Sequence, residues 1–165
     1  MCIRDRLQYV ETQLQTQIKA KPGDAKIHSA FGIFYRKTKQ FTKAAEQFAL
    51  ARGLSPLKPS LIINQGFVAY EQGDYETAHS FFTEAYQLVP EYHRARIFYL
   101  ATLILTERQN ETTALLTEPS NKELLNNPFI NRILTATTPV QFNEPTDAPG
   151  YDYIDTVGKL SLIHI

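Results

Sequence analysis

Three histidines, His28, His79 and His93, are the residues whose type best suits metal binding or proton transfer. Each lies in a different predicted helix. A metal site would therefore require distant parts of the chain to meet, whereas isolated histidines on helices are more often packing or surface groups. We predict that the chain binds no metal and no cofactor, although a site formed by tertiary contact remains open.

Three acids, Glu71, Asp74 and Glu76, lie around a predicted turn and could form an acid/base pair. That chemistry needs burial to shift a carboxyl pKa, and a turn is normally solvated. The sequence also contains no P-loop, dinucleotide fingerprint, HExxH or GxSxG motif. We therefore predict that these acids are solvated turn residues, that there are no catalytic residues, and that this fragment is not an enzyme.

An internal repeat defines the elements that carry these side chains. Six residue types recur in the same order, and each residue of the first copy lies 34 positions before its counterpart. The copies are Gly32, Phe41, Ala44, Phe48, Ala51, Pro56 and Gly66, Tyr75, Ala78, Phe82, Ala85, Pro90.

Each copy has the pattern of two helices. The run Phe41–Ala51 places large and small apolar residues three and four positions apart, which is typical of one helix face. Gly73 can adopt the left-handed conformation of a tight turn between the helices, whereas the first copy has Lys39 there. We therefore expect the turn at Lys39 to be less well defined.

The period and the pattern resemble the tetratricopeptide repeat family over about Ala25–Tyr92. This resemblance implies an all-α fold, an α-solenoid of antiparallel helix pairs that forms a right-handed superhelix. The family's common tryptophan in the first helix is replaced by His28, Ile62 and Arg96, so some packing detail should differ.

The repeat predicts the organisation of the chain. Residues 7–24 would be the second helix of a truncated repeat, 25–58 and 59–92 two repeats, and 93–138 divergent helices. In the third unit, the apolar residues of the expected second helix are shifted by about one position relative to those of the two copies. Further helices are expected from Ser120, which opens a capping box, and from Asn127-Pro128. Residues 139–159 are expected to be a loop or linker, or to fold back into the groove of the repeats.

Both ends resemble translated sequencing adapters, "MCIRDR" at 1–6 and "LSLIHI" at 160–165. We expect these segments to be artefacts and the natural part to be a fragment of about 7–159. A solenoid cut at both ends would expose apolar faces, so self-association is also expected.

The charge balance argues against a nucleic-acid partner, because 17 basic residues face 17 acidic ones. The distribution is uneven. Residues 19–58 hold nine basic residues and two acids, whereas residues 59–91 hold five acids and no Lys or Arg. The two regions are either ordinary solvated faces or a polarised surface that orients a partner.

The family resemblance implies that the first helix of each pair lines a concave groove for a protein or peptide partner. An extended or helical peptide with apolar anchors fits better than a carboxylate clamp, whose polar positions are occupied by Ile33 and Phe67. The alternative is that Ile33, Phe67 and Tyr70 pack against neighbouring helices and no ligand binds. The predicted groove residues are Lys26, Ser29, Ile33, Arg36, Lys37, Ile63, Asn64, Phe67, Tyr70, Glu71, Arg94, Ile97 and Phe98.

A second resemblance is to the repeat tails of bacterial O-antigen ligase or polymerase-like membrane proteins, carried by the stretch from "KPGDAKIHSAFGIFYRK" to "PEYHRARIFYLATLI". It implies a non-catalytic tail that organises glycan assembly, tethered to the membrane outside the cytoplasm. A stand-alone adaptor would instead be cytoplasmic. In neither case do we expect this fragment itself to contact the membrane. Apolar spans encoded upstream of Leu7 would distinguish the two.

Overall fold

The computed structural model describes residues 3–135, and within this range the chain forms helices and no strand. This confirms the prediction of an all-α fold. The elements, in order, are α1 (Ile3–Ala20), α2 (Ala25–Lys37), α3 (Phe41–Leu54), α4 (Pro59–Glu71), α5 (Tyr75–Leu88), α6 (His93–Leu105), α7 (Gln109–Thr117), the 3-10 helix η1 (Pro119–Asn126) and α8 (Pro128–Thr135).

The helix boundaries repeat with the period of the sequence. The helices α2, α4 and α6 each have 13 residues and begin at Ala25, Pro59 and His93, 34 positions apart. The helix α7 begins at Gln109, which is 34 positions after Tyr75, the first residue of α5. The helix start keeps the period, whereas the buried apolar residue of α7, Leu115, lies one position before the counterpart of Phe82 in α5. The third unit differs because α7 has nine residues where α5 has 14.

The turn inside each helix pair has the same backbone geometry three times. Lys39, Gly73 and Glu107 have positive φ angles of 61°, 81° and 57°. The expectation that the turn at Lys39 is less well defined is wrong, because backbone hydrogen bonds fix all three turns. The next residue's N–H donates to a carbonyl five positions earlier, from Gln40 to Tyr35 (2.8 Å), from Asp74 to Ala69 (3.0 Å) and from Arg108 to Leu103 (2.9 Å).

Side-chain caps mark several helix starts. The Asp24 carboxylate accepts from the Lys26 N–H at 2.8 Å, and the Asp74 carboxylate accepts from the Thr77 N–H at 3.1 Å. At α8, the Asn127 side-chain oxygen accepts from the Phe129 N–H at 2.9 Å, as expected for a helix opening at Asn127-Pro128. The helix expected from Ser120 is instead the 3-10 helix η1, which begins at Pro119 without a side-chain cap.

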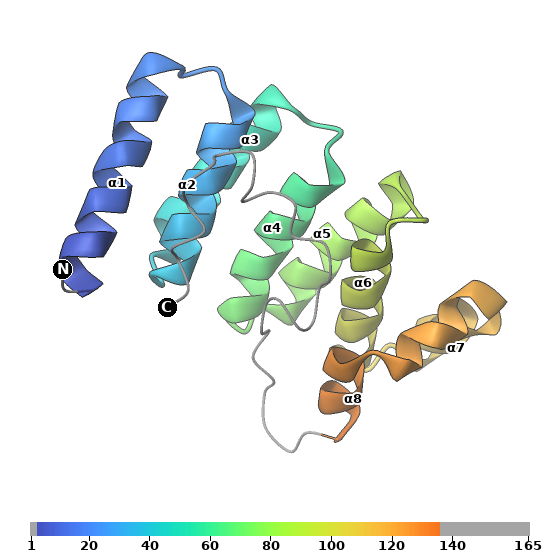
Figure 1. Ribbon diagram of the computed structural model, residues 1–165. Helices are drawn as coiled ribbons and strands as arrows, with labels where there is room; N and C mark the ends of the chain where they lie inside the picture. Colours follow the sequence, from blue (N-terminus) through green and yellow to red (C-terminus); the bar gives the residue numbers. More distant parts are fainter. Residues whose placement is uncertain (1–2, 136–165) are drawn as a thin grey trace.

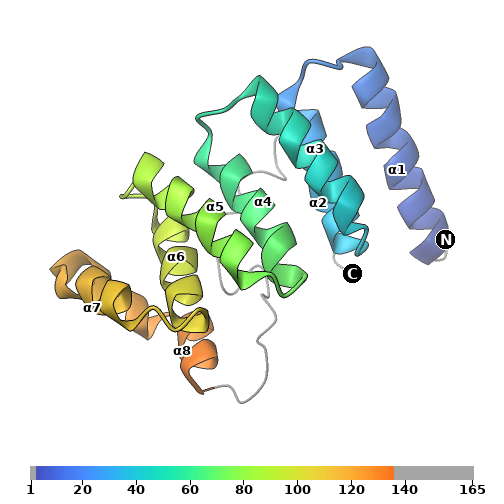
Figure 2. The same cartoon turned by 180° about the vertical axis from the view of Figure 1, so that it is seen from behind.

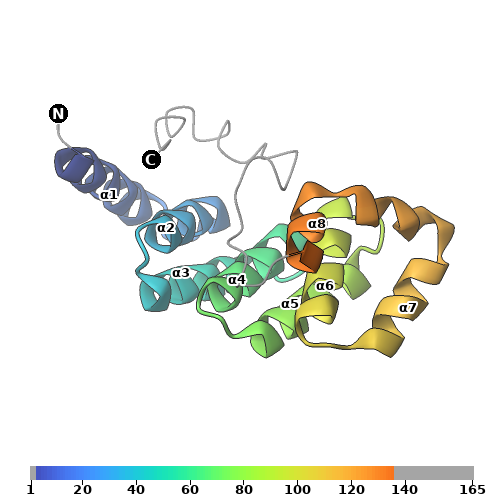
Figure 3. The ribbon, with the colours of Figure 1, turned by 90° about the horizontal axis from the view of Figure 1, so that it is seen from below.

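The helices lie in two layers. Figure 1 shows α2, α4 and α6 in succession in one layer, and Figure 2, from behind, shows α3 and α5 covering them. Each helix packs on the next along the chain from α1 to α7. Figure 3 places α1 at one end and α7 with α8 at the other. The layer of α2, α4 and α6 therefore has one face turned away from α3 and α5.

Two apolar clusters hold the layers together. Near the N-terminus, Leu14 of α1 packs with Phe31 and Phe34 of α2 and Phe48 of α3. The second cluster extends from Ile62 in α4 through α5 and α6 to α8. The two clusters bury residues from every α-helix from α1 to α8, so successive helices share their apolar cores.

Of the two adapter-like ends of the chain, the structure describes only residues 3–6. Ile3–Arg6, within the adapter-like segment, form the first turn of α1. The segments 139–159 and 160–165, expected to be a linker and an artefact, lie outside the described residues.

Candidate functional site

The thirteen predicted groove residues all lie on α2, α4 and α6, and together we name them the first-helix face. Five form an accessible rim: Lys26 and Lys37 are exposed, whereas Ile33, Glu71 and Arg94 are partly buried. The remaining eight form a buried floor, comprising Ser29, Arg36, Ile63, Asn64, Phe67, Tyr70, Ile97 and Phe98.

Phe67 of α4 is the centre of the face, because arginines from both neighbouring first helices reach it. The guanidinium carbon of Arg36 in α2 lies 5.3 Å from the centroid of the Phe67 ring. That of Arg94 in α6 lies 5.0 Å from the same centroid. Both distances are within the range of a cation–π interaction. Residues predicted separately on three helices thus meet at one ring.

An ion pair between Arg36 and Glu71 joins α2 to α4 beside this ring. The Arg36 side chain is 1% exposed and that of Glu71 is 12% exposed. A buried charge is stable only when it is paired and hydrogen-bonded, and Arg36 has a further interaction besides this pair. Glu71 therefore holds the orientation of a cation on the face, which is a structural role and not that of a turn acid in solvent.

The floor also belongs to the core. The Phe67 ring meets Phe98 of α6 edge-on at 4.5 Å and lies 5.6 Å from Phe82 of α5. The Tyr70 ring lies 5.3 Å from that of Tyr75 and 6.1 Å from that of Phe129 in α8. Phe67 and Tyr70 therefore hold helices together, so replacing them would alter stability as well as any binding.

Ser29 Oγ and Asn64 Oδ1 are among the buried polar atoms of the floor that have no hydrogen-bond partner within the described residues. The side chains belong to residues that are 1% and 5% exposed. Leaving such an atom unsatisfied costs about 1–3 kcal/mol. Both oxygens have less than 1 Å² exposed, so they lie beneath the surface of the face and not at a contact for a ligand.

The structure does not bring every predicted residue to Phe67. Ile33 packs against the N-terminal cluster around Leu14. Ile63 and Ile97 are fully buried in the second cluster. The side chains of Lys26 and Lys37 extend from opposite ends of α2 and remain exposed. The face therefore has closely packed side chains around Phe67, and its lysines lie farther away.

The charge of the face is positive. It contains four cations, Lys26, Arg36, Lys37 and Arg94, and one acid, Glu71, so its formal net charge is 4 − 1 = +3. The acid is already paired with the buried Arg36. The rim also carries the cations Lys26, Lys37 and Arg94, of which Lys37 and Arg94 have interactions of their own.

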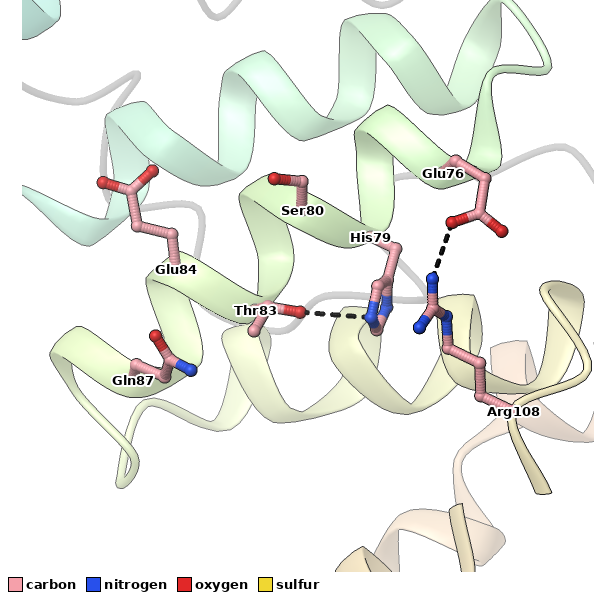
Figure 4. A pocket seen from close by; sticks show the side chains of 7 residues that line it. All are labelled: Glu76, His79, Ser80, Thr83, Glu84, Gln87 and Arg108. Carbon is pink, nitrogen blue, oxygen red and sulfur yellow. Dashed lines mark hydrogen bonds and ion pairs between the residues drawn. The ribbon is translucent and has the colours of Figure 1, made fainter. Parts of the chain in front are cut away.

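A second candidate is an open pocket of about 460 Å³ on the outer layer, shown in Figure 4. Seven polar or charged residues line it, six of them on α5. They are Glu76, His79, Ser80, Thr83, Glu84, Gln87 and Arg108. The sequence contained no spacing that indicated this pocket, because Arg108 joins α5 only through the fold.

His79 is the buried member of this pocket. Its Nδ1 lies 3.2 Å from Thr102 Oγ1, and its Nε2 lies 3.4 Å from Thr83 Oγ1. The ring stacks on Tyr99 with centroids 5.5 Å apart. Burial lowers the pKa of His79, and the positive charge of Arg108 lowers it further. With both ring nitrogens engaged, His79 serves packing and offers no free ligand atom.

The other residues considered for chemistry also have structural partners. His28 Nδ1 lies 2.9 Å from Gln47 Oε1, and its Nε2 lies 2.9 Å from the Pro22 carbonyl oxygen. The exposed His93 lies 3.3 Å from an Arg96 nitrogen. Across residues 3–135, no group of three His, Cys, Asp or Glu side chains is arranged to hold a metal ion.

The turn acids also separate in space. Asp74 caps α5, and its hydrogen bonds from Thr77 lower the pKa of its carboxyl group. Glu76 accepts from Arg108 at 2.8 Å. With Glu71 bound to Arg36, each of the three acids has its own partner and no acid/base pair forms among them.

Comparisons with known proteins identify no family: no family model matches the chain, and no curated protein gives a significant match. Within the described range, none of the helices has the length and apolar character needed to cross a membrane.

Proposed function

We propose that this chain is a protein-interaction scaffold of the tetratricopeptide type, an α-solenoid of antiparallel helix pairs that forms a right-handed superhelix. In this proposal the first-helix face is the concave surface, and it binds a peptide or a partner helix. The repeated helix boundaries, the three identical turns and the packing of each helix on the next support the solenoid.

The observation that carries the proposal is the meeting of Arg36, Phe67 and Arg94. These side chains come from three successive first helices, so a ligand lying across α2, α4 and α6 would meet all of them. A catalytic role has no comparable support, since the histidines and turn acids considered for chemistry are engaged in a cap, ion pairs and packing.

The rim would make the first contacts with a partner. Ile33 is the apolar residue of the rim. Lys37 of α2 and Arg94 of α6 carry positive charges on either side of α4. The buried floor would define the shape beneath them. Binding should therefore depend on rim residues, and floor substitutions would combine a binding effect with a stability effect.

A random-peptide display library selected against the full chain tests this proposal. Selected peptides should bind the unmodified chain and lose binding to the rim variant Lys37→Glu/Arg94→Glu. The matched control is Lys43→Glu, because Lys43 is an exposed lysine on α3 in the other layer. Circular dichroism would check that both variants keep their helices.

The proposal fails if no peptide is enriched, or if the rim variant and the Lys43→Glu control bind the selected peptides equally well. Equal loss in both variants would indicate a general charge effect and would also exclude a specific role for the first-helix face.

A further inference from the structure

We propose that α8 is an internal occupant of the first-helix face, and that the partner of the α4–α6 part of this face is an amphipathic helix with the apolar pattern of α8. This inference rests on the proposed function and specifies its ligand as a helix, and not an extended peptide. Binding of the partner would displace α8, so α8 would control access to this part of the face.

The position of α8 in the chain predicts a different place for it. Successive first helices begin at Ala25, Pro59 and His93, so the next is due 34 positions later at residue 127, and α8 begins at Pro128. In the repeated arrangement, α4 packs closely on α3, and α6 on α5. The helix α8 packs instead on α6 and η1. It therefore leaves the succession of helix pairs and turns onto the layer of first helices.

Phe129 anchors α8 on two residues of the first-helix face. Its ring lies 5.4 Å from that of Phe98 in α6 and 6.1 Å from that of Tyr70 in α4. Because α4 and α6 belong to successive repeats, α8 reaches across two first helices. In Figure 3, α8 lies above α6 and α5 lies below it. A helix of the same chain therefore covers the α4–α6 part of the face.

The apolar side of α8 shows what this part of the face accepts. Phe129, Ile130 and Ile133 are buried in the second cluster, whereas Leu134 on the same helix is 52% exposed. An aromatic residue is thus followed by aliphatic residues one and four positions later, which lie on one side of a helix. A partner helix with this spacing could make the same contacts with α4 and α6.

The short length of α8 favours its displacement. It has eight residues, whereas α2, α4 and α6 have 13 each. Helices shorter than about 12 residues are marginal in water, so α8 depends on its contacts with the face to remain helical. A second helix that offers the same anchors would therefore compete with it directly.

The connection to η1 would let α8 leave alone. Arg96 of α6 donates to the Glu123 carboxylate at 2.9 Å and to the Ser120 carbonyl oxygen at 3.3 Å, so η1 has its own attachment to α6. Between η1 and α8, Asn127 has extended backbone angles, with φ −70° and ψ 128°. A rotation at this residue would release α8 while η1 keeps its contacts.

An NMR titration of the full chain with a helix supplied in trans provides the test. The probe is a peptide of residues 127–135, blocked at both ends, and the comparison peptide carries Phe129→Ala and Ile133→Ala. The protein variants are Phe129→Ala/Ile133→Ala, which removes two anchors of the internal helix, and Leu134→Ala, the matched control on the exposed side of α8. Circular dichroism would measure the helix content of each variant.

We expect the probe to bind Phe129→Ala/Ile133→Ala at least about tenfold more tightly than the unmodified chain, because a tethered helix competes at a roughly millimolar effective concentration. The shifted resonances should lie in α4 and α6. Leu134→Ala should behave like the unmodified chain, and the comparison peptide should bind neither. In the unmodified chain, amide hydrogen exchange should be faster in α8 than in α6, because α8 opens locally.

The inference would be overturned by equal affinity of the probe for Phe129→Ala/Ile133→Ala and the unmodified chain, or by no binding to that variant. Unfolding of the variant, or exchange in α8 as slow as in α6, would assign α8 to the permanent core and overturn it as well. A dimer of the unmodified chain that the same variant dissociates would identify a second copy's α8 as the occupant, in place of a separate partner. The display selection decides the scaffold function independently of these results.

Discussion

The ring of Phe82 lies directly against Gly66, so that a Cβ atom at residue 66 would be 2.5 Å from a ring carbon. Phe48 has the same relationship to Gly32, where the distance would be 2.6 Å. The two contacts join the helices of each pair at equivalent positions. The glycines in the repeat thus allow a phenylalanine of the second helix to cross the first helix closely.

Replacing Gly66 with Ala should destabilise the fold by about 1–3 kcal/mol, because the added methyl group overlaps the Phe82 ring. The matched control is Gly53→Ala in α3, where nothing lies within 4 Å of the added Cβ. That control should be stabilising by up to about 1 kcal/mol. Urea unfolding measures both changes, and equal free energies of unfolding for the two variants would contradict the packing described.

The left-handed turns lead to a second prediction. Lys39 has a φ angle of 61°, which costs a residue with a side chain about 1–2 kcal/mol relative to the right-handed region. Lys39→Gly should therefore raise the free energy of unfolding by about 1 kcal/mol. The reciprocal change, Gly73→Ala, should lower it by a similar amount. Thermal unfolding would show opposite shifts in Tm, and shifts of the same sign would argue against the shared turn.

A buried and an exposed interhelical ion pair should differ in their contribution to stability. Arg36–Glu71 is buried, whereas Arg52–Glu84 has side chains that are 29% and 45% exposed. Glu71→Ala should cost about 3 kcal/mol because it leaves a buried cation with one partner fewer. Glu84→Ala should cost less than about 1 kcal/mol. Denaturant unfolding would measure the free energy of unfolding of both variants. A larger decrease for Glu84→Ala than for Glu71→Ala would contradict the expected order.

His79 should make stability depend on pH. Its pKa is lowered in the folded chain, mainly by burial and then by Arg108, from an ordinary value of 6.5. The unfolded chain then binds the proton more readily, so stability should decrease as the pH falls through about 6.5 toward the folded pKa. Above that range this contribution is constant.

His79→Gln should remove this part of the pH dependence, while His93→Gln should leave it in place because His93 is exposed and does not line the pocket. Unfolding curves between about pH 5 and 8 would compare the variants. If the stability of His79→Gln decreased with falling pH as much as that of the unmodified chain, another group would be responsible for the pH dependence.

The sequence was sufficient to predict the helices and their period because their signals are local. The large and small apolar residues at helical spacing, and the recurrence of residues such as Gly66 and Phe82, depend on positions within one helix pair. The start of α8 could also be predicted, since Asn127 and Pro128 cap it locally.

Features that depend on contacts between distant segments could not be predicted in this way. The burial of Phe67 results from side chains of α2, α5 and α6 that converge on it, and Phe129 of α8 adds to the same cluster. Likewise, the turn at Lys39 forms because packing and backbone hydrogen bonds outweigh the preference of lysine for negative φ. A lysine in place of glycine at residue 39 had indicated, wrongly, that this turn would be less well defined.

We propose that a partner binds the face formed by α2, α4 and α6. Hydrogen–deuterium exchange of the full chain, with and without a peptide selected from the display library, would locate the bound surface. We predict slower exchange on binding in α2, α4 and the first half of α6, with little change in α3 and α5. Protection concentrated in α3 and α5, or no protection by a peptide that binds, would contradict the claim.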